Sequence, residues 1–274
     1  MFNTIIQQMN ELAKAVECFS IGKSGGGKDI WCFKLGCGGK TILIQCAIHA
    51  REHITTFFAL EHIKYLKNFY IGGTIYYIPC MNPDGVQLCL DGAGTLPANK
   101  RRKLTKINKG TDFTLYKANI NGVDLNTNFD ADWGRGKFNI TTPASENFVG
   151  NYPHSESEVK ALVNFTKEVM PDITLSYHSK GEVIYYGFNK PLSVLEKRYL
   201  KIIKELTGYK SVKTKNSTGG YKDYCISKLN IPSYTIEVGN DHFKHPVPMS
   251  ELEVIFEQNR LVPLKLMKQL ASNK

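Results

Sequence analysis

Residues 40–53, KTILIQCAIHAREH, say more about the fold of this chain than any other stretch. Residues 40–47 form a short apolar run rich in β-branched side chains, which is the pattern of a strand buried on both faces. The run leads directly into a polar turn and then into a helical pattern over residues 52–68. A buried strand followed at once by a helix predicts one unit of a parallel sheet.

The same pattern recurs along the chain. Further strands are predicted at TIYYIPC (74–80), DITLSYH (172–178), EVIYYGF (182–188) and SYTIEVG (233–239). Helices are predicted at residues 155–170, at 192–207 and from 221 onward. Because no linker or internal repeat divides the chain, we expect a single α/β domain with a mixed, mostly parallel central sheet flanked by helices.

Two segments are assigned separately. Residues 1–20 have helical periodicity between positions 4 and 17 and are predicted as an N-terminal helical segment, which leaves residues 21–274 as the main domain. Residues 91–120 are rich in Gly, Pro, Asn and basic side chains and are predicted as a long loop. A loop of that length in a compact domain is usually functional or mobile.

Composition excludes several classes of protein. Of the 274 residues, 42% are hydrophobic and 22% are charged, which is a globular rather than a disordered composition. No apolar run approaches about 18 residues, so no membrane span is expected. The net charge of +10 is compatible with nucleic acid, an anionic membrane or an acidic wall polymer as partner. Charge alone does not distinguish among these three.

Two features bear on the cellular location. The first residues, MFNTIIQQMNELAKAVECF, have neither a basic start nor a continuous apolar core, so a signal peptide is not expected. The seven cysteines are odd in number, scattered, and without a CxxC pair, which favours free thiols over a disulfide framework or a cysteine zinc site. Both features predict a cytoplasmic protein.

Candidate metal ligands fall at the carboxyl ends of predicted strands, where ligands bind in parallel α/β sheets. His49 and Glu52 lie three residues apart at a strand–helix junction, and His178 ends a separate strand. Two imidazoles and one carboxylate leave a tetrahedral zinc with one open position for water. About 0.6 matches to H-x-x-[DE] are expected by chance, and one occurs, so the spacing alone leaves an exposed, charged helix start as an equal alternative.

Six sequence blocks occur in order along the chain. They are IHAREH (48–53), NPDG (82–85), GVDLNTNFD (122–130), YHSKGEVIYY (177–186), GGYKDY (219–224) and TIEVG (235–239). Together they resemble the zinc carboxypeptidase family, from about residue 20 to the C-terminus. The stretches YKAN with VDLN, HSKGEVIY and GGYKDY resemble the bacterial branch that cleaves the γ-D-glutamyl–meso-diaminopimelate bond of cell-wall peptides.

The resemblance implies a zinc metallopeptidase with one Zn²⁺ per chain, held by His49, Glu52 and His178. It also implies that Glu237 is the catalytic carboxylate, which takes a proton from the attacking water and returns it to the leaving amine. The alternative for Glu237 is a buried glutamate in an ion pair, and the alternative for His178 is a core histidine. A carboxylate is costly to bury unpaired in a strand, which favours a site for Glu237.

The sequence departs from the family pattern at the positions that hold the substrate. Asn126 matches the asparagine that helps to hold the substrate's carboxylate. Thr127 stands where the family has an arginine that binds this carboxylate bidentately. Lys117 is the nearest match to the arginine that steadies the oxyanion, with Arg101 or Arg102 as alternatives.

The specificity residues also differ from the pancreatic enzymes of the family. Lys215 stands at the position of a tyrosine, which leaves Tyr221 and Asp223 as the better specificity candidates. In this interpretation Asp223 pairs with the extra ammonium of diaminopimelate. Lys215 or Arg101 pairs with its carboxylate.

The sequence therefore predicts a zinc peptidase whose partner is a peptide or muropeptide substrate. A general metallocarboxypeptidase and a zinc deacylase of N-acyl amino acids are alternatives within the same fold. A non-catalytic wall-peptide binder is the alternative from another class; Thr127 favours it and the complete ligand set opposes it. No nucleic acid is expected as partner, because the basic run KRRKLTK (100–106) comes without a nucleic-acid-binding module. The oligomeric state stays open.

Overall fold

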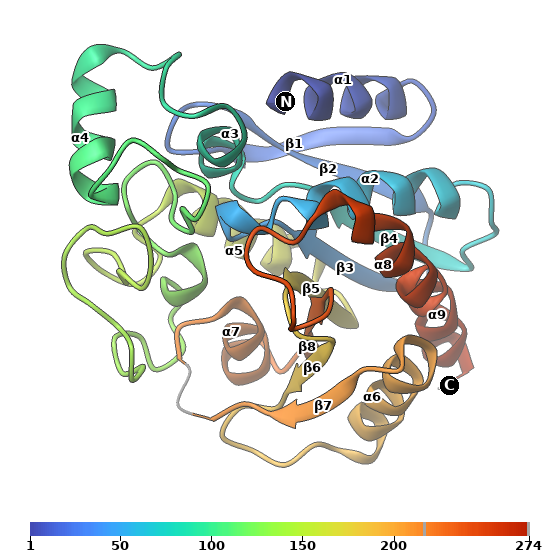
Figure 1. Ribbon diagram of the computed structural model, residues 1–274. Helices are drawn as coiled ribbons and strands as arrows, with labels where there is room; N and C mark the ends of the chain where they lie inside the picture. Colours follow the sequence, from blue (N-terminus) through green and yellow to red (C-terminus); the bar gives the residue numbers. More distant parts are fainter. Residues whose placement is uncertain (216–217, 273–274) are drawn as a thin grey trace.

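The computed structural model describes residues 1–215 and 218–272 (Figure 1). Within these residues the chain forms an eight-stranded sheet with the order β1-β2-β4-β3-β5-β8-β6-β7. The strands are β1 (Glu17–Lys23), β2 (Asp29–Gly36), β3 (Lys40–Cys46), β4 (Gly73–Ile78), β5 (Ile173–Ser179), β6 (Val183–Tyr186), β7 (Lys210–Lys213) and β8 (Ser233–Val238).

The central strands β4, β3, β5 and β8 run parallel to one another, and β6 and β7 also form a parallel pair. The antiparallel pairs are β1 with β2, β2 with β4, and β6 with β8. In β3, Ile42 and Ile44 contribute to one apolar layer and Leu43 to the other. This burial on both faces explains the continuous apolar run, and the predicted mixed, mostly parallel sheet is confirmed.

Helices cover both faces of the sheet, so that the domain has three layers (Figure 1). One face packs against α1 (Phe2–Ala13), α2 (Ile54–Leu66), α6 (Val194–Thr207), α8 (Leu252–Asn259) and α9 (Val262–Ser272). The other face packs against α5 (Ser157–Val169) and α7 (Tyr221–Lys228). A smaller apolar cluster joins α3 (Pro83–Asp91) and α4 (Ala98–Asn108) to the turn that follows β3. None of the described helices is long and apolar enough to cross a membrane.

The N-terminal segment differs from the prediction. Helix α1 ends at Ala13 and β1 begins at Glu17, so the boundary predicted at residue 20 lies inside a strand. Phe2 and Ile5 of α1 are buried in the same core as α2. The helix therefore packs as part of the main domain.

The long loop predicted at residues 91–120 contains helix α4. Lysine and arginine are good helix formers, but Leu104 is the one buried residue of this helix among those described. A helix with so few apolar contacts has no apolar periodicity for a sequence pattern to reveal. The loop prediction is therefore wrong for Ala98–Asn108.

Candidate active site

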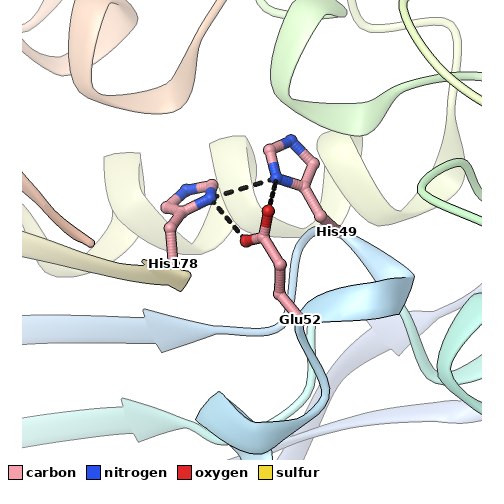
Figure 2. A group of neighbouring side chains, drawn as sticks. All are labelled: His49, Glu52 and His178. Atoms are coloured by element: carbon pink, nitrogen blue, oxygen red, sulfur yellow. Dashed lines mark hydrogen bonds and ion pairs between the residues drawn. The ribbon is translucent and has the colours of Figure 1, made fainter. Parts of the chain in front are cut away.

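Two strand ends bring the predicted metal ligands together (Figure 2). After β3 ends, the chain passes through His49 into the short 3-10 helix η1 (Ala50–Glu52). Strand β5, the parallel neighbour of β3, carries His178 near its carboxyl end. All three side chains are buried and point toward one another in Figure 2.

The distances among these side chains fit a single metal ion. Oε1 of Glu52 lies 2.8 Å from Nδ1 of His49, and Oε2 lies 2.9 Å from Nδ1 of His178. The two Nδ1 atoms are 3.1 Å apart. Two imidazole nitrogens and a carboxylate that converge on one point form the donor set of a zinc site with one open position. His49, Glu52 and His178 are therefore suited to hold one Zn²⁺ ion.

Asp124 lies beside the ring nitrogen of His49 that faces away from the metal position. Its Oδ1 lies 3.2 Å from Nε2 of His49, and its Oδ2 lies 2.8 Å from Nζ of Lys117. The backbone N–H groups of Asn126 and Asn147 donate to the same carboxylate. Burial alone would raise the pKa of Asp124, but the charges of Lys117 and His49 hold it well below its usual range. An ionised partner at Nε2 orients the ring and directs the Nδ1 lone pair to the metal position.

Two carboxyl groups of the site have opposite pKa shifts. The charges of His49 and His178 hold the pKa of Glu52 well below its usual range. They outweigh burial, which alone would raise this pKa. Glu237 on β8 is the register partner of His178, and burial raises its pKa to about 7. Environments that separate the pKa values of neighbouring carboxyl groups also separate their roles. Glu52 has the charged form that a metal ligand needs, and Glu237 can exchange a proton near neutral pH.

A cavity of about 510 Å³ opens beside this cluster. The sequence-predicted residues that line it are His49, Lys117, Asn126, Thr127, Lys215, Asp223 and Glu237. No arginine is among the described residues of the lining. The cavity therefore has no guanidinium where the family pattern has one.

Two predicted site residues lie elsewhere. Tyr221 is fully buried in the apolar layer of α5 and α7, and its hydroxyl lies 2.8 Å from Oγ1 of Thr166. Its side chain therefore packs in the core, away from the cavity. Arg101 is an exposed residue of α4 and does not line the cavity.

Asn126 and Thr127 are already bonded within the protein. Oγ1 of Thr127 donates to the carbonyl of Asp124 over 2.8 Å. Oδ1 of Asn126 accepts a hydrogen bond from the backbone N–H of Tyr221 over 3.0 Å. These bonds fix the wall of the cavity between η2 (Leu125–Thr127) and the start of α7.

A buried ion pair in the cavity includes a residue that sequence reasoning missed. Lys222 and Asp223, in the first turn of α7, are 5% and 2% exposed and form a short ion pair. Nζ of Lys222 also donates to the carbonyl of Gly187 over 2.9 Å. Burial raises the pKa of Asp223, although the charge of Lys222 opposes this. Lys222 stands beside Asp223 in GGYKDY, but lysine is almost never buried, so the sequence favours a solvated side chain.

Sequence reasoning also missed Asp124 and the run Gly136–Asn139, which line the same cavity. The signal for Asp124 is its place between apolar residues in GVDLN, where a carboxylate needs partners. The run GKFN carries no motif, and its contribution to the cavity follows from the path of a long connection.

The fold and the site together define the class of protein. An α/β sheet whose parallel strands end at a two-histidine, one-glutamate cluster, with a further carboxylate in the adjoining cavity, has the parts of a zinc hydrolase. The sequence model of the zinc carboxypeptidase family matches residues 2–261. The chain belongs to this family and is a zinc metallopeptidase, as its sequence blocks predict.

Individual relatives agree with this assignment. The γ-D-glutamyl-L-diamino acid endopeptidase 1 of Lysinibacillus sphaericus is 30% identical over 240 residues, which cover 82% of this chain and 60% of that protein. The chain thus spans less than two thirds of this relative, whose name supports the predicted bacterial branch.

Solved structures show the same fold. Bovine thrombin-activatable fibrinolysis inhibitor, in complex with tick carboxypeptidase inhibitor, has a TM-score of 0.76 at 20% identity, covering 100% of this chain and 96% of that chain. The murein-tripeptide amidase MpaA of Escherichia coli O157 has a TM-score of 0.63 at 20% identity, and the match covers 92% of this chain and 91% of that chain.

Proposed function

We propose that the protein hydrolyses the amide bond between γ-D-glutamate and meso-diaminopimelate in cell-wall peptides. The observation that carries this proposal is the buried Lys222–Asp223 pair in the cavity. The side chain of diaminopimelate ends in an ammonium and a carboxylate on one carbon. When such an end group binds, two ion pairs can replace the one between Lys222 and Asp223. The carboxylate of the substrate would pair with Lys222, and its ammonium would pair with Asp223. The L. sphaericus relative, named for a γ-D-glutamyl-L-diamino acid linkage, supports the same substrate class.

The residues of the site divide the chemistry among them. His49, Glu52 and His178 would hold the zinc ion, which would supply a Lewis acid for the substrate carbonyl and a lowered pKa for water. We assign the general base to Glu237, which takes the proton of the attacking water and passes it to the nitrogen of the leaving amine. The proton lost by the nucleophile thus ends on the product amine. The position of Glu237 in the cavity wall, one strand from His178, supports this assignment.

We assign stabilisation of the developing oxyanion to Lys117. Lys117 lines the cavity, and its Nζ is held 2.8 Å from Oδ2 of Asp124. Burial alone would lower the pKa of Lys117, but the charge of Asp124 raises it above its usual value. The side chain is therefore cationic at neutral pH, and a fixed cation stabilises negative charge that develops on a carbonyl oxygen.

We assign substrate binding to Asn126, Thr127 and Lys215. Lys215 is an exposed residue that lines the cavity, and its ammonium can attract a carboxylate. Thr127 offers no bidentate partner to the α-carboxylate of an ordinary C-terminal residue. This disfavours a general metallocarboxypeptidase, whereas a zinc deacylase of N-acyl amino acids would use the same catalytic residues.

The test compares kcat/KM for γ-D-Glu–meso-diaminopimelate with that for a hydrophobic C-terminal dipeptide at equal zinc content. We expect the diamino acid substrate to be preferred, and Lys222→Gln to reduce the preference. Lys228→Gln, an exposed lysine at the end of the same helix, is the matched control. Thr127→Arg should raise activity on the plain substrate. Equal kcat/KM values, or a preference for the plain substrate, would refute the proposed specificity.

We also propose that the protein works in a reducing compartment, the cytoplasm. All seven cysteines are free, and burial raises the pKa of the Cys80 and Cys225 thiols to about 12, which keeps them protonated. Fractionation of the producing cell tests this location, and recovery of the protein from the culture medium would contradict it.

A further inference from the structure

We infer that Asn82 is a positioning residue, which holds the metal-bearing turn at a fixed place relative to Lys117. Asn82 opens NPDG (82–85), a block of the sequence that the proposed chemistry does not use. The residue is fully buried and is not among the described residues that line the cavity. Any effect on the reaction therefore passes through other residues. Its catalytic consequence rests on the proposed function, because it depends on the role assigned to Lys117.

The side-chain amide of Asn82 joins two segments of backbone. Its Nδ2 donates to the carbonyl of Ile48 over 3.3 Å and to the carbonyl of Ala118 over 3.0 Å. Ile48 directly precedes the metal ligand His49. Ala118 directly follows Lys117. One amide group therefore ties the backbone beside a metal ligand to the backbone beside the proposed oxyanion-stabilising cation.

Other hydrogen bonds fix the orientation of Asn82. Its backbone N–H donates to the carbonyl of Ala47, just after β3, over 3.1 Å. Its Oδ1 accepts a hydrogen bond from the N–H of Gly85 over 3.0 Å, which caps the first turn of α3. An N–H can only donate and a carbonyl can only accept, so these partners determine which end of the amide is oxygen and which is nitrogen. Both amide hydrogens are thus directed at the two carbonyls.

Helix capping alone does not explain an asparagine at this position. Serine, aspartate and asparagine cap the start of a helix about equally well, because a cap needs only an acceptor oxygen. The two amide hydrogens of Asn82 have no part in the cap. Only the bonds to Ile48 and Ala118 use them, so the bridge is the feature that requires an amide.

Gly85, the last residue of NPDG, shows how closely the second segment approaches. A Cβ atom on Gly85 would lie 2.6 Å from the carbonyl oxygen of Ala118 and 2.6 Å from Nδ2 of Asn82. Both distances are far inside the contact distance of about 3.5–4.0 Å for carbon atoms. A side chain at this position would push the bridge apart, so the block needs a glycine here as well as an asparagine.

His49 and Lys117 are also linked through their side chains. Asp124 lies 3.2 Å from Nε2 of His49 and 2.8 Å from Nζ of Lys117. The Asn82 bridge joins the backbones of the same two segments. The two residues are therefore held together at both ends. A cation stabilises a developing oxyanion best when its position is set before the reaction, and the bridge sets the backbone part of that position.

The first test needs neither zinc nor substrate. The N–H of Ala50 donates to the carbonyl of Lys117 over 3.1 Å and reports on the junction that the bridge closes. Asn82→Ser keeps an acceptor for the cap of α3 but has no amide donors. In metal-free protein we expect amide hydrogen exchange at Ala50 to be about 10-fold faster in this variant. Gly85→Ala, which displaces the Ala118 carbonyl, is a second variant with the same expected direction.

Lys28→Gln is the matched control. It breaks the ion pair with Asp84, a buried carboxylate of the same NPDG block, and leaves the bonds to Ile48 and Ala118 in place. We expect thermal unfolding to give a lower Tm for both Lys28→Gln and Asn82→Ser. The control should nevertheless keep native hydrogen exchange at the junction and native kcat, which separates the bridge from general stability.

The second test is a double-mutant cycle on kcat for γ-D-Glu–meso-diaminopimelate at saturating zinc. Asn82→Ser should lower kcat about 10²-fold, while zinc content stays at one per chain because all three ligands remain. Lys117→Gln removes the cation that Asn82 positions. In the Lys117→Gln background, Asn82→Ser should lower kcat by less than about 3-fold, because residues that act as a unit are not additive.

Each outcome decides a separate claim. Unchanged exchange at Ala50 in both Asn82→Ser and Gly85→Ala would overturn the bridge, whatever the substrate is. An equal loss of kcat with and without the Lys117 ammonium would indicate a general structural effect and overturn the positioning role. If the unsubstituted, zinc-loaded protein does not hydrolyse the peptide, the proposed function fails and the catalytic part of the inference falls with it. The exchange measurement still decides the bridge in that case.

Discussion

His178 of β5 and Glu237 of β8 are direct register partners in adjacent parallel strands. Partners in register share a face of the sheet, so the imidazole and the carboxylate rise from the same side, at the end where the cavity opens. Ser176 and Thr235 repeat this relationship two residues earlier. The spacing between a metal ligand and the proposed base is therefore fixed by the hydrogen bonds of the central sheet, while connections such as Gly136–Asn139 line the rest of the cavity.

Loss of one imidazole should release the metal. His178→Ala leaves His49 and Glu52, and two protein ligands hold zinc much more weakly than three. We expect the variant to lose most of its zinc on dialysis, as measured by metal analysis. His242→Ala, which changes an exposed histidine in a loop, should keep full occupancy. Full occupancy in His178→Ala would show that the ligand set is wrong.

Glu237→Gln should separate catalysis from metal binding. The amide keeps the shape of the side chain but cannot accept the proton of water, so kcat should fall about 10²–10⁴-fold. Zinc content should stay at one per chain, because Glu237 is not a ligand. Steady-state kinetics with metal analysis measures both, with Glu253→Gln on the exposed side of α8 as the control. A near-normal kcat would remove Glu237 from the mechanism.

Asp124→Asn should weaken metal binding without removing a ligand. The carboxylate lies 3.2 Å from Nε2 of His49 and carries the charge that orients this ring. Loss of such a partner typically reduces metal affinity about 10–100-fold. Competition with a chelator measures the change, and Asp112→Asn, at an exposed residue, serves as the control. An unchanged zinc affinity would contradict the supporting role of Asp124.

Glu158 should make stability depend on pH. Its side chain is fully buried, and burial raises its pKa from 4.5 to about 7, with the charges of Glu156 and Asp84 adding to the effect. Between these two values the folded state binds a proton that the unfolded state releases, so the contribution of Glu158 to stability falls as pH rises from about 4.5 to about 7. The corresponding free energy is about 3 kcal/mol at most.

Glu158→Gln removes this titration while its oxygen can still accept the hydrogen bond from the N–H of Gly25. Relative to the unsubstituted protein, the variant should gain thermal stability at pH 8 and gain little or none at pH 4.5. Thermal unfolding at both pH values measures the difference. Glu168→Gln, an exposed position on the same helix, should show no such trend. A gain that is equal at both pH values would contradict the buried titration.

The positions of His49, Glu52, His178 and Glu237 at strand ends could be predicted because local patterns place them, whereas their roles were implied by the resemblance to the zinc carboxypeptidase family. A buried strand that runs into a helix positions His49 and Glu52, and two other buried strands end at His178 and beside Glu237. Each of these strands is recognisable from its own residues. The order of the blocks then brings the strand ends together, because parallel strands meet at one edge of the sheet.

The remaining wall of the cavity depends on contacts between distant segments. Lys222 is buried because Gly187 and Asp223 surround its ammonium, which no local pattern shows. Tyr221, one residue earlier on α7, turns into the core and was wrongly expected at the cavity. Helix α4 forms on a stretch whose composition indicates a loop. Gly187, which binds Lys222, and much of the core around Tyr221 lie far from these residues in sequence, and α4 is covered mainly by solvent. A local sequence pattern does not contain this information.

The most direct test of the account is a zinc titration of metal-free protein, followed by hydrolysis of γ-D-Glu–meso-diaminopimelate. We expect no turnover without metal, a rise in proportion to added zinc, and a plateau at one equivalent per chain. The same titration of Glu237→Gln should bind one equivalent and remain nearly inactive. Full turnover in the metal-free protein, or one bound zinc with no hydrolysis of this amide by the unsubstituted protein, would contradict the account.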